Sequence, residues 1–129
     1  SFLLVMRRAP RSTRLPYTTL FRSTVRRVGE VYREYRFSLL LPASLYDPEA
    51  EPEDELMLQG VVDCAFRTEQ GLVIVDFKTD RILPQEAAQR AELYRPQLTA
   101  YSQALSRVLE APVAERVLYF FGPGCQVTL

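Results

Sequence analysis

The stretch LVIVDFK (residues 72–78) constrains the fold of this chain more than any other feature. It is rich in β-branched residues and apolar at both odd and even positions, which is typical of a central strand covered on both faces. A turn-like TEQG (residues 68–71) separates it from a second strand-like run, LMLQGVVDCAF (residues 56–66). Because Gly71 suits a positive φ, the sequence predicts a hairpin built from these two strands.

The rest of the sequence predicts further strands and two helices around this hairpin. VYREYRFSLLLPA (residues 31–43) and ERVLYFF (residues 115–121) have the pattern of strands, and CQVTL (residues 125–129) is expected to pair back. A short helix is expected over residues 84–93. A second helix has Pro96 in its first turn and an apolar stripe of Leu98, Tyr101, Leu105 and Val108. This order favours an α/β fold in which helices pack against a mixed sheet.

Composition narrows the classes of function. A chain of 129 residues is one domain or part of one, and it has no run near the roughly 20 apolar residues of a membrane span. The sequence contains no histidine, which excludes His-based catalytic triads and His-rich metal sites. Its two cysteines, Cys64 and Cys125, are far apart, so they suggest neither a disulfide framework nor a zinc site and fit a reducing cytoplasm.

Residues 1–23 differ in character from the rest. They hold five arginines and no acid, which leaves eleven basic against sixteen acidic residues, a net charge of −5, in residues 24–129. An arginine-rich, acid-free start is typical of transit peptides and of nucleic-acid-binding arms. PYTTLFRS (residues 16–23), however, resembles the in-frame translation of a sequencing adaptor. We therefore interpret residues 1–23 as a disordered assembly artefact and residues 24–129 as a domain fragment.

Each strand of the predicted hairpin carries an acid where an apolar side chain would pack better. Asp63 and Asp76 lie at nearly equal offsets from the turn, so we expect their carboxylates to be close together. Two adjacent carboxylates repel unless a cation lies between them or one of them keeps a proton. Mg²⁺ satisfies this requirement, because it typically takes one or two carboxylates along with other oxygens. The backbone carbonyl of Phe77 is a candidate for one of those oxygens.

Lys78 follows Asp76 by two residues and therefore points to the same face of the strand. Beside a metal ion it would orient or deprotonate the attacking water, or offset charge on a phosphorane-like transition state. A plainer interpretation also stays open, in which Asp76 and Lys78 form an ion pair and Asp63 caps a turn. The apolar setting weighs against it, because unpaired buried charge costs on the order of several kcal/mol.

Five stretches, REYRFSLLLPA, LQGVVDCAF, GLVIVDFKTDR, ELYRPQLTAYSQAL and VLYFF, follow one another over nearly all of residues 31–129. In this order they resemble the RecB-type branch of the PD-(D/E)xK nucleases. They are most similar to the C-terminal nuclease domains of the AddA subunits of bacterial AddAB helicase–nucleases. The resemblance implies a restriction-endonuclease-like fold, in which helices flank a mixed β-sheet and a core β-hairpin carries the acids.

The resemblance also implies roles for residues at matching positions. The implied catalytic residues are Asp63, Asp76, Lys78, Gln97 and Tyr101, and the metal ligands are Asp63 and Asp76 together with the Phe77 backbone carbonyl. Gln97 and Tyr101 match the family's Q-x-x-x-Y helix motif. As an i, i+4 pair on one helical face they can also be reasoned to reach a DNA phosphate or to position Lys78. Tyr101 is equally compatible with a place in the core.

Four further positions match the family pattern less strongly. Glu34 corresponds to an acid on the first strand, where it is either a metal ligand through water or an exposed strand residue. Asp80 and Arg81 continue the pattern in KTDR, or else they close the strand and cap the next helix. Tyr94 lies in the matching ELYRPQ stretch.

The implied activity is a Mg²⁺-dependent DNA exonuclease, with Mn²⁺ as an alternative ion, which hydrolyses phosphodiesters at single-stranded ends during recombinational repair of double-strand breaks. The implied partners are DNA and the AddB subunit of a heterodimer, in the bacterial cytoplasm and away from membranes. Two alternatives are a stand-alone RecB-like exonuclease and a non-catalytic domain that docks a partner subunit.

Three departures from the family pattern bear on this choice. The family usually has a metal-binding histidine upstream of the first strand, and this sequence has none. No GxxxxGK[ST] phosphate-binding loop of a helicase occurs either. Two distant cysteines cannot hold the iron–sulfur cluster of some related nucleases.

Overall fold

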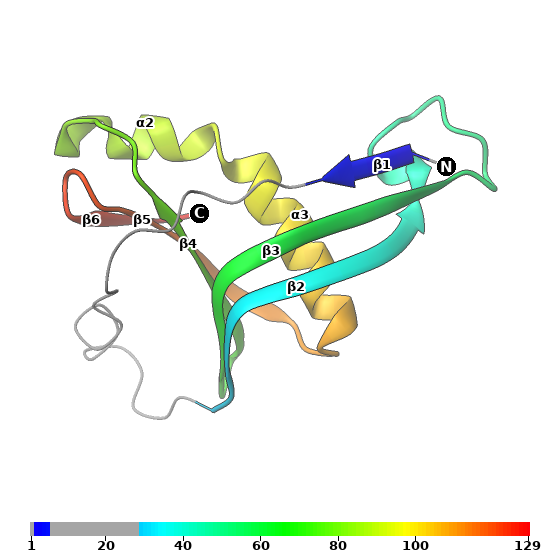
Figure 1. Ribbon diagram of the computed structural model, residues 1–129, viewed down its shortest axis with the longest axis horizontal. Helices are drawn as coiled ribbons and strands as arrows, with labels where there is room; N and C mark the ends of the chain where they lie inside the picture. Colours follow the sequence, from blue (N-terminus) through cyan, green and yellow to red (C-terminus); the bar gives the residue numbers. More distant parts are fainter. Residues whose placement is uncertain (1, 6–28) are drawn as a thin grey trace.

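The computed structural model describes residues 2–5 and 29–129, which form a six-stranded mixed sheet flanked by helices (Figure 1). The strands are β1 (Phe2–Val5), β2 (Val31–Pro42), β3 (Glu55–Thr68), β4 (Gly71–Lys78), β5 (Val113–Phe120) and β6 (Cys125–Thr128). The helices are α2 (Ala87–Glu92) and α3 (Arg95–Val108), with single 3-10 turns η1 (Ala43–Leu45) and η2 (Pro84–Glu86). The mixed α/β architecture predicted from the sequence is confirmed.

Strand β4 lies in the middle of the sheet. It pairs antiparallel with β3 and parallel with β5, and β6 adds antiparallel to β5 as expected for the CQVTL segment. Every residue of β4 from Leu72 to Lys78 is buried. The prediction of a central strand is therefore confirmed, because the side chains on both faces of β4 are buried.

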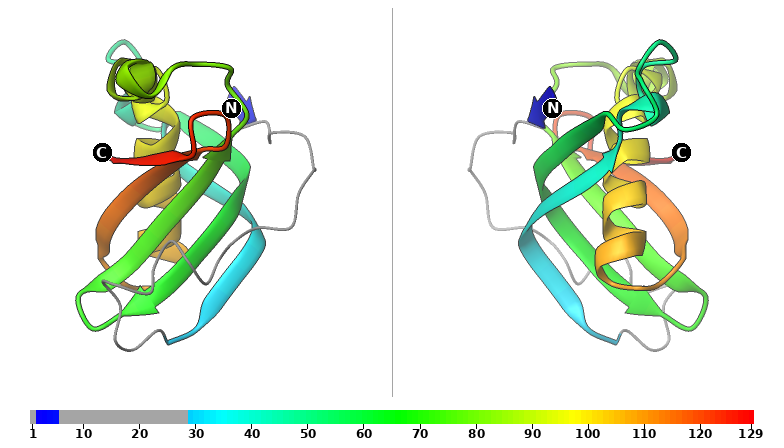
Figure 2. Two further views of the ribbon diagram at one scale, coloured as in Figure 1. Left: turned by 90° about the vertical axis from the view of Figure 1, so that its left-hand side faces the viewer. Right: turned by 90° about the vertical axis from the view of Figure 1, so that its right-hand side faces the viewer.

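The side chains of β4 alternate between two apolar clusters. Leu72 and Ile74 join the larger cluster, which also contains the buried residues of α3. The smaller cluster faces the other way and consists of Cys64, Phe66, Val73, Val75, Phe77 and Val117. Figure 2 shows α3 running along one face of the sheet, the face of the larger cluster.

The β3–β4 turn is tight, and the backbone of Pro112 packs against it. Thr68 pairs with Gly71, so the turn consists of Glu69 and Gln70 as predicted. Gly71 has φ 134°, and a Cβ there would lie 2.5 Å from the carbonyl oxygen of Pro112. The neighbouring Leu72 amide donates a hydrogen bond to that oxygen at 2.8 Å. Only glycine fits a position that combines this φ with so close a backbone.

The chain returns from β4 to β5 through η2, α2 and α3, close to the predicted pair of helices. The first helix is divided into a 3-10 turn and the short α2, and Pro96 lies in the first turn of α3 as expected. Leu98, Tyr101 and Leu105 are buried, but the prediction for Val108 is wrong, since it is 39% exposed. Val108 is the last residue of α3, where the chain turns away toward β5. No helix among the described residues is long and apolar enough to cross a bilayer.

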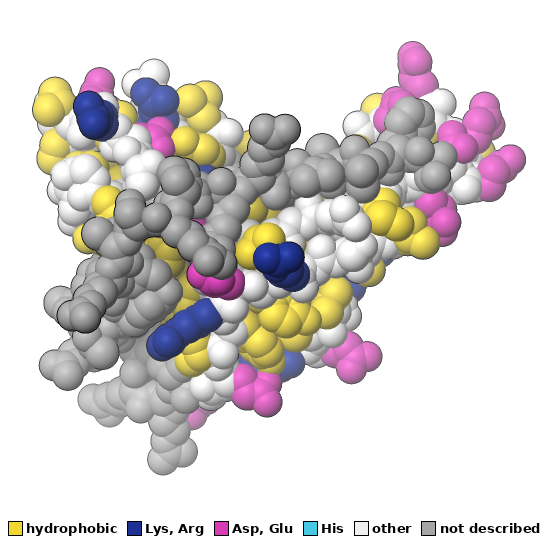
Figure 3. Space-filling model, in the orientation of Figure 1, with side chains coloured by type: hydrophobic (Ala, Val, Ile, Leu, Met, Phe, Trp, Pro, Cys, Tyr) yellow, Lys and Arg dark blue, Asp and Glu magenta, His cyan; other side chains and the backbone are white. Residues whose placement is uncertain are grey.

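Strands β2 and β3 extend together beyond β4 and β5 as an arm, along which β1 pairs with β3. At its far end, residues 47–55 carry six acidic side chains, most of them exposed, and these gather at one tip of the molecule in Figure 3. A loop with so little to bury stays in solvent, as its composition predicts.

Strand β1 lies within residues 1–23, which the sequence analysis interprets as a disordered assembly artefact. Phe2–Val5 pairs in parallel with residues 56–59 of β3. β4 covers that edge of β3 only over residues 64–68, so the edge nearer the arm is open to another strand. The interpretation of residues 1–23 stays a prediction, and most of them lie outside the described part of the chain.

Candidate active site at the fork between β3 and β4

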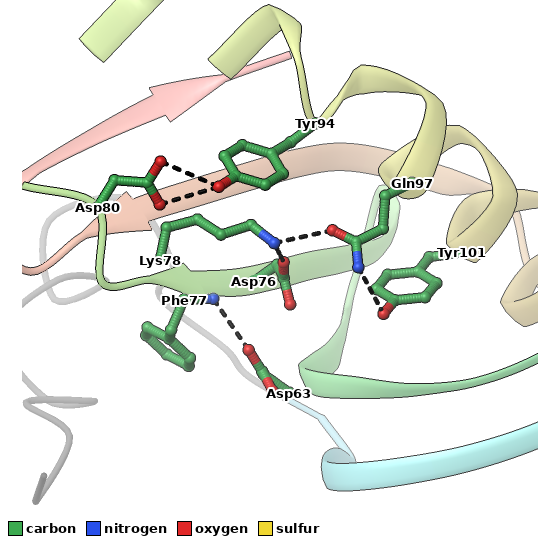
Figure 4. Close-up of polar contacts among 8 residues, drawn as sticks. All are labelled: Asp63, Asp76, Phe77, Lys78, Asp80, Tyr94, Gln97 and Tyr101. Atoms are coloured by element: carbon green, nitrogen blue, oxygen red, sulfur yellow. Dashed lines mark hydrogen bonds and ion pairs between the residues drawn. The ribbon is translucent and has the colours of Figure 1, made fainter. Parts of the chain in front are cut away.

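The two predicted acids lie where β3 and β4 separate. The backbone ladder between these strands ends at the pair Cys64–Val75, one residue before Asp63 and Asp76. Beyond this fork β3 continues with β2 while β4 continues with β5. The two carboxylates lie beside each other (Figure 4), and the residues are only 8% and 4% exposed. The structure thus brings together the pair that the sequence predicts.

Side-chain alternation along β3 is interrupted at this fork. Val62 belongs to the cluster beneath α3, whereas Cys64, two residues later, belongs to the opposite cluster. On β2, Arg33 is in register with Cys64 and Tyr35 with Val62, and Glu34 between them has a left-handed φ of 49°. The irregularity in both strands leaves Asp63 at the fork and outside either apolar cluster.

Asp63 prolongs the strand pairing with its side chain. Its Oδ2 accepts a hydrogen bond from the backbone N–H of Phe77 at 3.0 Å. That amide lies just past the last backbone pair, so the carboxylate takes the place of a missing strand partner. Asp63 is therefore fixed to β4 by a contact that leaves Asp76 beside it (Figure 4).

Asp76 is the less satisfied of the two acids. Its Oδ2 lies 2.7 Å from the Lys78 ammonium, yet within the described residues this buried oxygen accepts no well-aligned hydrogen bond. The pKa of Asp76 is raised from 3.8 to about 7, chiefly by burial and also by the neighbouring Asp63, although the Lys78 charge lowers it. Near neutral pH this carboxyl is thus poised between a protonated and a charged form.

Lys78 is the only lysine of the chain, and it is 7% exposed. Besides the ion pair with Asp76, its ammonium donates a hydrogen bond to Gln97 Oε1 at 2.8 Å. The same nitrogen lies 3.9 Å from the centroid of the Tyr94 ring. Contacts from β4, from the α2–α3 junction and from the first turn of α3 therefore hold this one cation.

Gln97 and Tyr101 form a chain that leads from Lys78 into the core. Gln97 donates from Nε2 to the Tyr101 hydroxyl at 3.1 Å. Tyr101 is 1% exposed and packs edge-on against Phe37, with ring centroids 5.7 Å apart. Burial, and next the charge of Asp76, raise the pKa of its hydroxyl above its usual range. Both interpretations of Tyr101 apply, because it is a core residue that also anchors Gln97.

The remaining predicted residues surround this centre. The backbone of Phe77 lies at the fork, while its ring stacks on Phe121 at 5.5 Å on the face away from α3. Glu34 is exposed on β2, in the position facing Asp63. Arg81 is exposed just beyond β4.

Asp80 and Tyr94 contribute more to the site than sequence reasoning assigned to them. Asp80 does not cap the following helical turn, whose N-cap is Leu83. Its carboxylate instead accepts the Tyr94 hydroxyl hydrogen, with its oxygens 2.9 and 3.0 Å away, and lies 3.6 Å from Arg90. In the sequence, only the ELYRPQ match pointed to Tyr94, and that match does not predict that the Tyr94 ring faces Lys78.

Comparison with protein families shows which superfamily the chain belongs to. The model of the PD-(D/E)XK nuclease superfamily matches residues 5–127. The chain belongs to this superfamily. The restriction-endonuclease-like fold and the core hairpin with its two acids, both implied by the resemblance, are thereby confirmed.

Curated relatives within the PD-(D/E)XK superfamily share one name, which describes the A subunit of an ATP-dependent helicase/nuclease. The protein of Desulforudis audaxviator is 44% identical over 96 residues, which is 73% of this chain and 8% of that protein. Those of Geobacillus thermodenitrificans and Pediococcus pentosaceus are 44% and 38% identical over 71% and 73% of this chain. The chain thus spans less than a tenth of the length of these relatives, and its resemblance to their nuclease domains is confirmed.

PD-(D/E)XK nucleases generally use divalent metal ions, and the fork has suitable ligands for one. Two adjacent carboxylates are hard oxygen donors, and the poorly satisfied Oδ2 of Asp76 is the kind of buried atom that a cation would satisfy. Among the described residues, three or more acidic, Cys or His side chains do not gather at one point. Mg²⁺ tolerates so small a set, because it usually keeps several waters and binds substrate phosphate oxygens.

Proposed function

We propose that this chain is a Mg²⁺-dependent deoxyribonuclease domain, with Mn²⁺ as an alternative ion, that hydrolyses DNA phosphodiester bonds at the β3–β4 fork. The observation that carries the proposal is the burial of Asp76 between a second carboxylate and the only lysine of the chain. Such an arrangement is costly for stability alone, since burial disfavours the charged carboxylate.

Asp63 and Asp76 would hold the metal, together with the Phe77 backbone carbonyl and, through water, Glu34. A divalent cation bound there supplies Lewis acidity toward the scissile phosphate and lowers the pKa of the attacking water. Asp63 keeps its orientation through the Phe77 amide. Asp76 must be deprotonated to act as a ligand, and the Lys78 charge favours that form.

Lys78 would orient the attacking water and offset negative charge that develops on the phosphate in the transition state. Gln97 holds the lysine from α3, and Tyr101 holds Gln97 from the core. The chain of contacts fixes an otherwise flexible four-carbon side chain, which is what a catalytic group requires. Lys78 is thus the catalytic lysine, and Gln97 and Tyr101 act through it.

In the cell we infer that this domain digests single-stranded DNA ends as an exonuclease within a larger helicase–nuclease of the bacterial cytoplasm. The support is the helicase/nuclease name shared by its relatives and the small share of their length that it spans. Because that name designates one subunit of an assembly, it implies a second subunit, for which AddB is the candidate. The work of the assembly would be to process double-strand breaks for recombinational repair.

The test is cleavage of end-labelled single-stranded DNA by the full 129-residue chain, with Mg²⁺, Mn²⁺ or a chelator. We expect cutting that needs the metal ion and disappears in Asp63→Ala and Asp76→Ala. Calorimetric titration with Mn²⁺ runs beside it. A folded chain that neither cuts DNA nor binds Mn²⁺ would contradict the proposal and favour the non-catalytic docking domain.

A further inference from the structure

The surroundings of Lys78 are more complete than a single ion pair. Three described groups contact its ammonium: Asp76 at 2.7 Å, Gln97 Oε1 at 2.8 Å and the face of the Tyr94 ring at 3.9 Å. If the proposed function is right, Asp76 must also serve as a metal ligand. Asp76 is the only anion among these three groups, so Lys78 would share it with the metal ion during cleavage.

The Tyr94 side chain is itself held in place by a hydrogen bond and by a neighbouring ring. Tyr94 lies at the junction of α2 and α3, as the residue before the first turn of α3. Its hydroxyl is committed to Asp80, and Arg90 lies 3.6 Å from that carboxylate. The ring also lies 6.4 Å from that of Phe120 on β5. Because the hydroxyl already has a partner, the part of Tyr94 that faces the site is its π surface.

We propose that Tyr94 is a positioning residue: its ring face holds the Lys78 ammonium beside Asp76, and Asp80 holds the ring. A cation over an aromatic face gains most where water is excluded, and Lys78 is 7% exposed. The ring is neutral and does not compete with a metal ion for Asp76. It therefore keeps the charge of Lys78 in the site when Asp76 acts as a ligand. This inference rests on the proposed function only for its effect on cleavage.

Two substitutions separate the ring from the hydroxyl. Tyr94→Phe keeps the π face and removes the bond to Asp80, whereas Tyr94→Leu keeps apolar volume without the π face. Tyr46→Leu is a matched control, because the Tyr46 hydroxyl also donates to a side chain, Gln103 at 2.9 Å, and neither residue is among the three groups that contact Lys78. The experiment compares these variants with the wild-type chain by two measurements.

The first measurement needs no activity. Since Lys78 is the only lysine, ¹³C labelling at lysine Cε gives one side-chain signal in an NMR spectrum. Protons above an aromatic ring are shielded, so we expect the ε protons to resonate upfield in the wild type, in Tyr94→Phe and in Tyr46→Leu. In Tyr94→Leu they should return to the ordinary lysine frequency. An unshifted signal in the wild type, or one that Tyr94→Leu leaves in place, would overturn the inference.

The second measurement is steady-state cleavage of a single-stranded oligonucleotide. We expect Tyr94→Leu to lower kcat about tenfold with KM nearly unchanged, and Tyr94→Phe to recover most of the loss. Equal losses in both variants would show that the ring face has no special role. If even the wild-type chain does not cut, the proposed function fails by itself, and the NMR signal alone decides whether Tyr94 positions Lys78.

Discussion

The two faces of strand β4 show two different uses of a buried position. On the face away from α3, Val73, Val75 and Phe77 are uniformly apolar and packed. On the α3 face, Leu72 and Ile74 are followed by Asp76 and Lys78, which are buried to a similar degree. One strand thus stabilises the fold with one face and carries ionisable groups with the other.

The difference arises at one step along the strand. Up to Val75 the backbone of β3 accompanies β4, and apolar side chains fill both faces. From Asp76 onward β3 has left, and the place of its backbone is taken by the Asp63 carboxylate. The charged pair therefore lies at the point where β3 and β4 separate.

The sharpest test of this comparison contrasts neighbours on opposite faces, Asp76→Ala and Val75→Ala. Loss of a metal ligand should reduce cleavage by on the order of 10³-fold or more. Val75→Ala should instead leave kcat within a few-fold while destabilising the domain by on the order of 2 kcal/mol, because it opens a cavity. Cleavage assays and thermal unfolding of both variants separate the effects. Similar loss of cleavage in both would mean that the faces are not functionally distinct.

Lys78→Met should have the next largest effect. It removes the charge but keeps the length of the side chain, so we expect cleavage to fall on the order of 10²- to 10³-fold. Because the Lys78 charge lowers the pKa of Asp76, that pKa should rise above its value of about 7 in the variant. Mn²⁺ binding would then require a higher pH. Ile74→Met, on the same face, is the control, and an unchanged pH midpoint for Mn²⁺ binding would contradict the assignment.

The pH dependence of the wild-type chain gives a smaller but more specific effect. With a pKa raised from 3.8 to about 7, Asp76 holds a proton in the folded state over a range where the unfolded chain has released it. The free energy of unfolding of the metal-free protein should therefore decrease as pH rises through this window. A metal ion must displace the proton, so its apparent affinity should fall up to tenfold per pH unit below about 7.

Thermal unfolding with and without Mn²⁺ measures this effect. The ion should raise the Tm by several degrees at about pH 8, since each kcal/mol of ligand stabilisation corresponds to about 4–8 °C in a domain of this size. At about pH 5 the increase should vanish, and Asp76→Ala should show none at either pH. A Tm increase that persists at low pH would place the ion elsewhere.

Glu34→Gln should have the smallest effect. Glu34 is exposed on β2, and β3 with Asp63 lies between it and Asp76, so we expect any contribution to metal binding to pass through water. We expect Mn²⁺ affinity to weaken by about tenfold or less, with kcat unchanged at saturating ion. Glu69→Gln in the hairpin turn is the control. A loss as large as that of Asp76→Ala would make Glu34 a direct ligand.

The sequence predicted the central parts of this arrangement well. Local rules of strand period and turn geometry were enough for three features. These are the LVIVDFK strand that is apolar on both faces, the glycine after a two-residue turn, and the equal distances of Asp63 and Asp76 from that turn. The stripe of α3 was predicted for the same reason. Only its last member, Val108, was misplaced, because helix ends depend on where the chain goes next.

What the sequence did not reveal depends on contacts between segments that no local period links. The side-chain alternation is interrupted at Asp63 because β3 and β4 diverge there. Strand β1 pairs with the part of the β3 edge that β4 leaves open. Tyr94 reaches Lys78 only because the α2–α3 junction lies over the end of β4. From the sequence pattern, Tyr94 is only an aromatic residue that precedes a helix.

The packing of Gly71 against the Pro112 carbonyl has a consequence for protein engineering. Hairpin tips are ordinarily good places to insert a tag or to open new termini. Here Gly71, directly after the tip, packs against the loop that leads into β5, so an insertion beside it would disturb the packing of β4 on that loop. The acidic loop of residues 47–54, exposed at the tip of the arm, is the more permissive place for a reporter or an affinity handle.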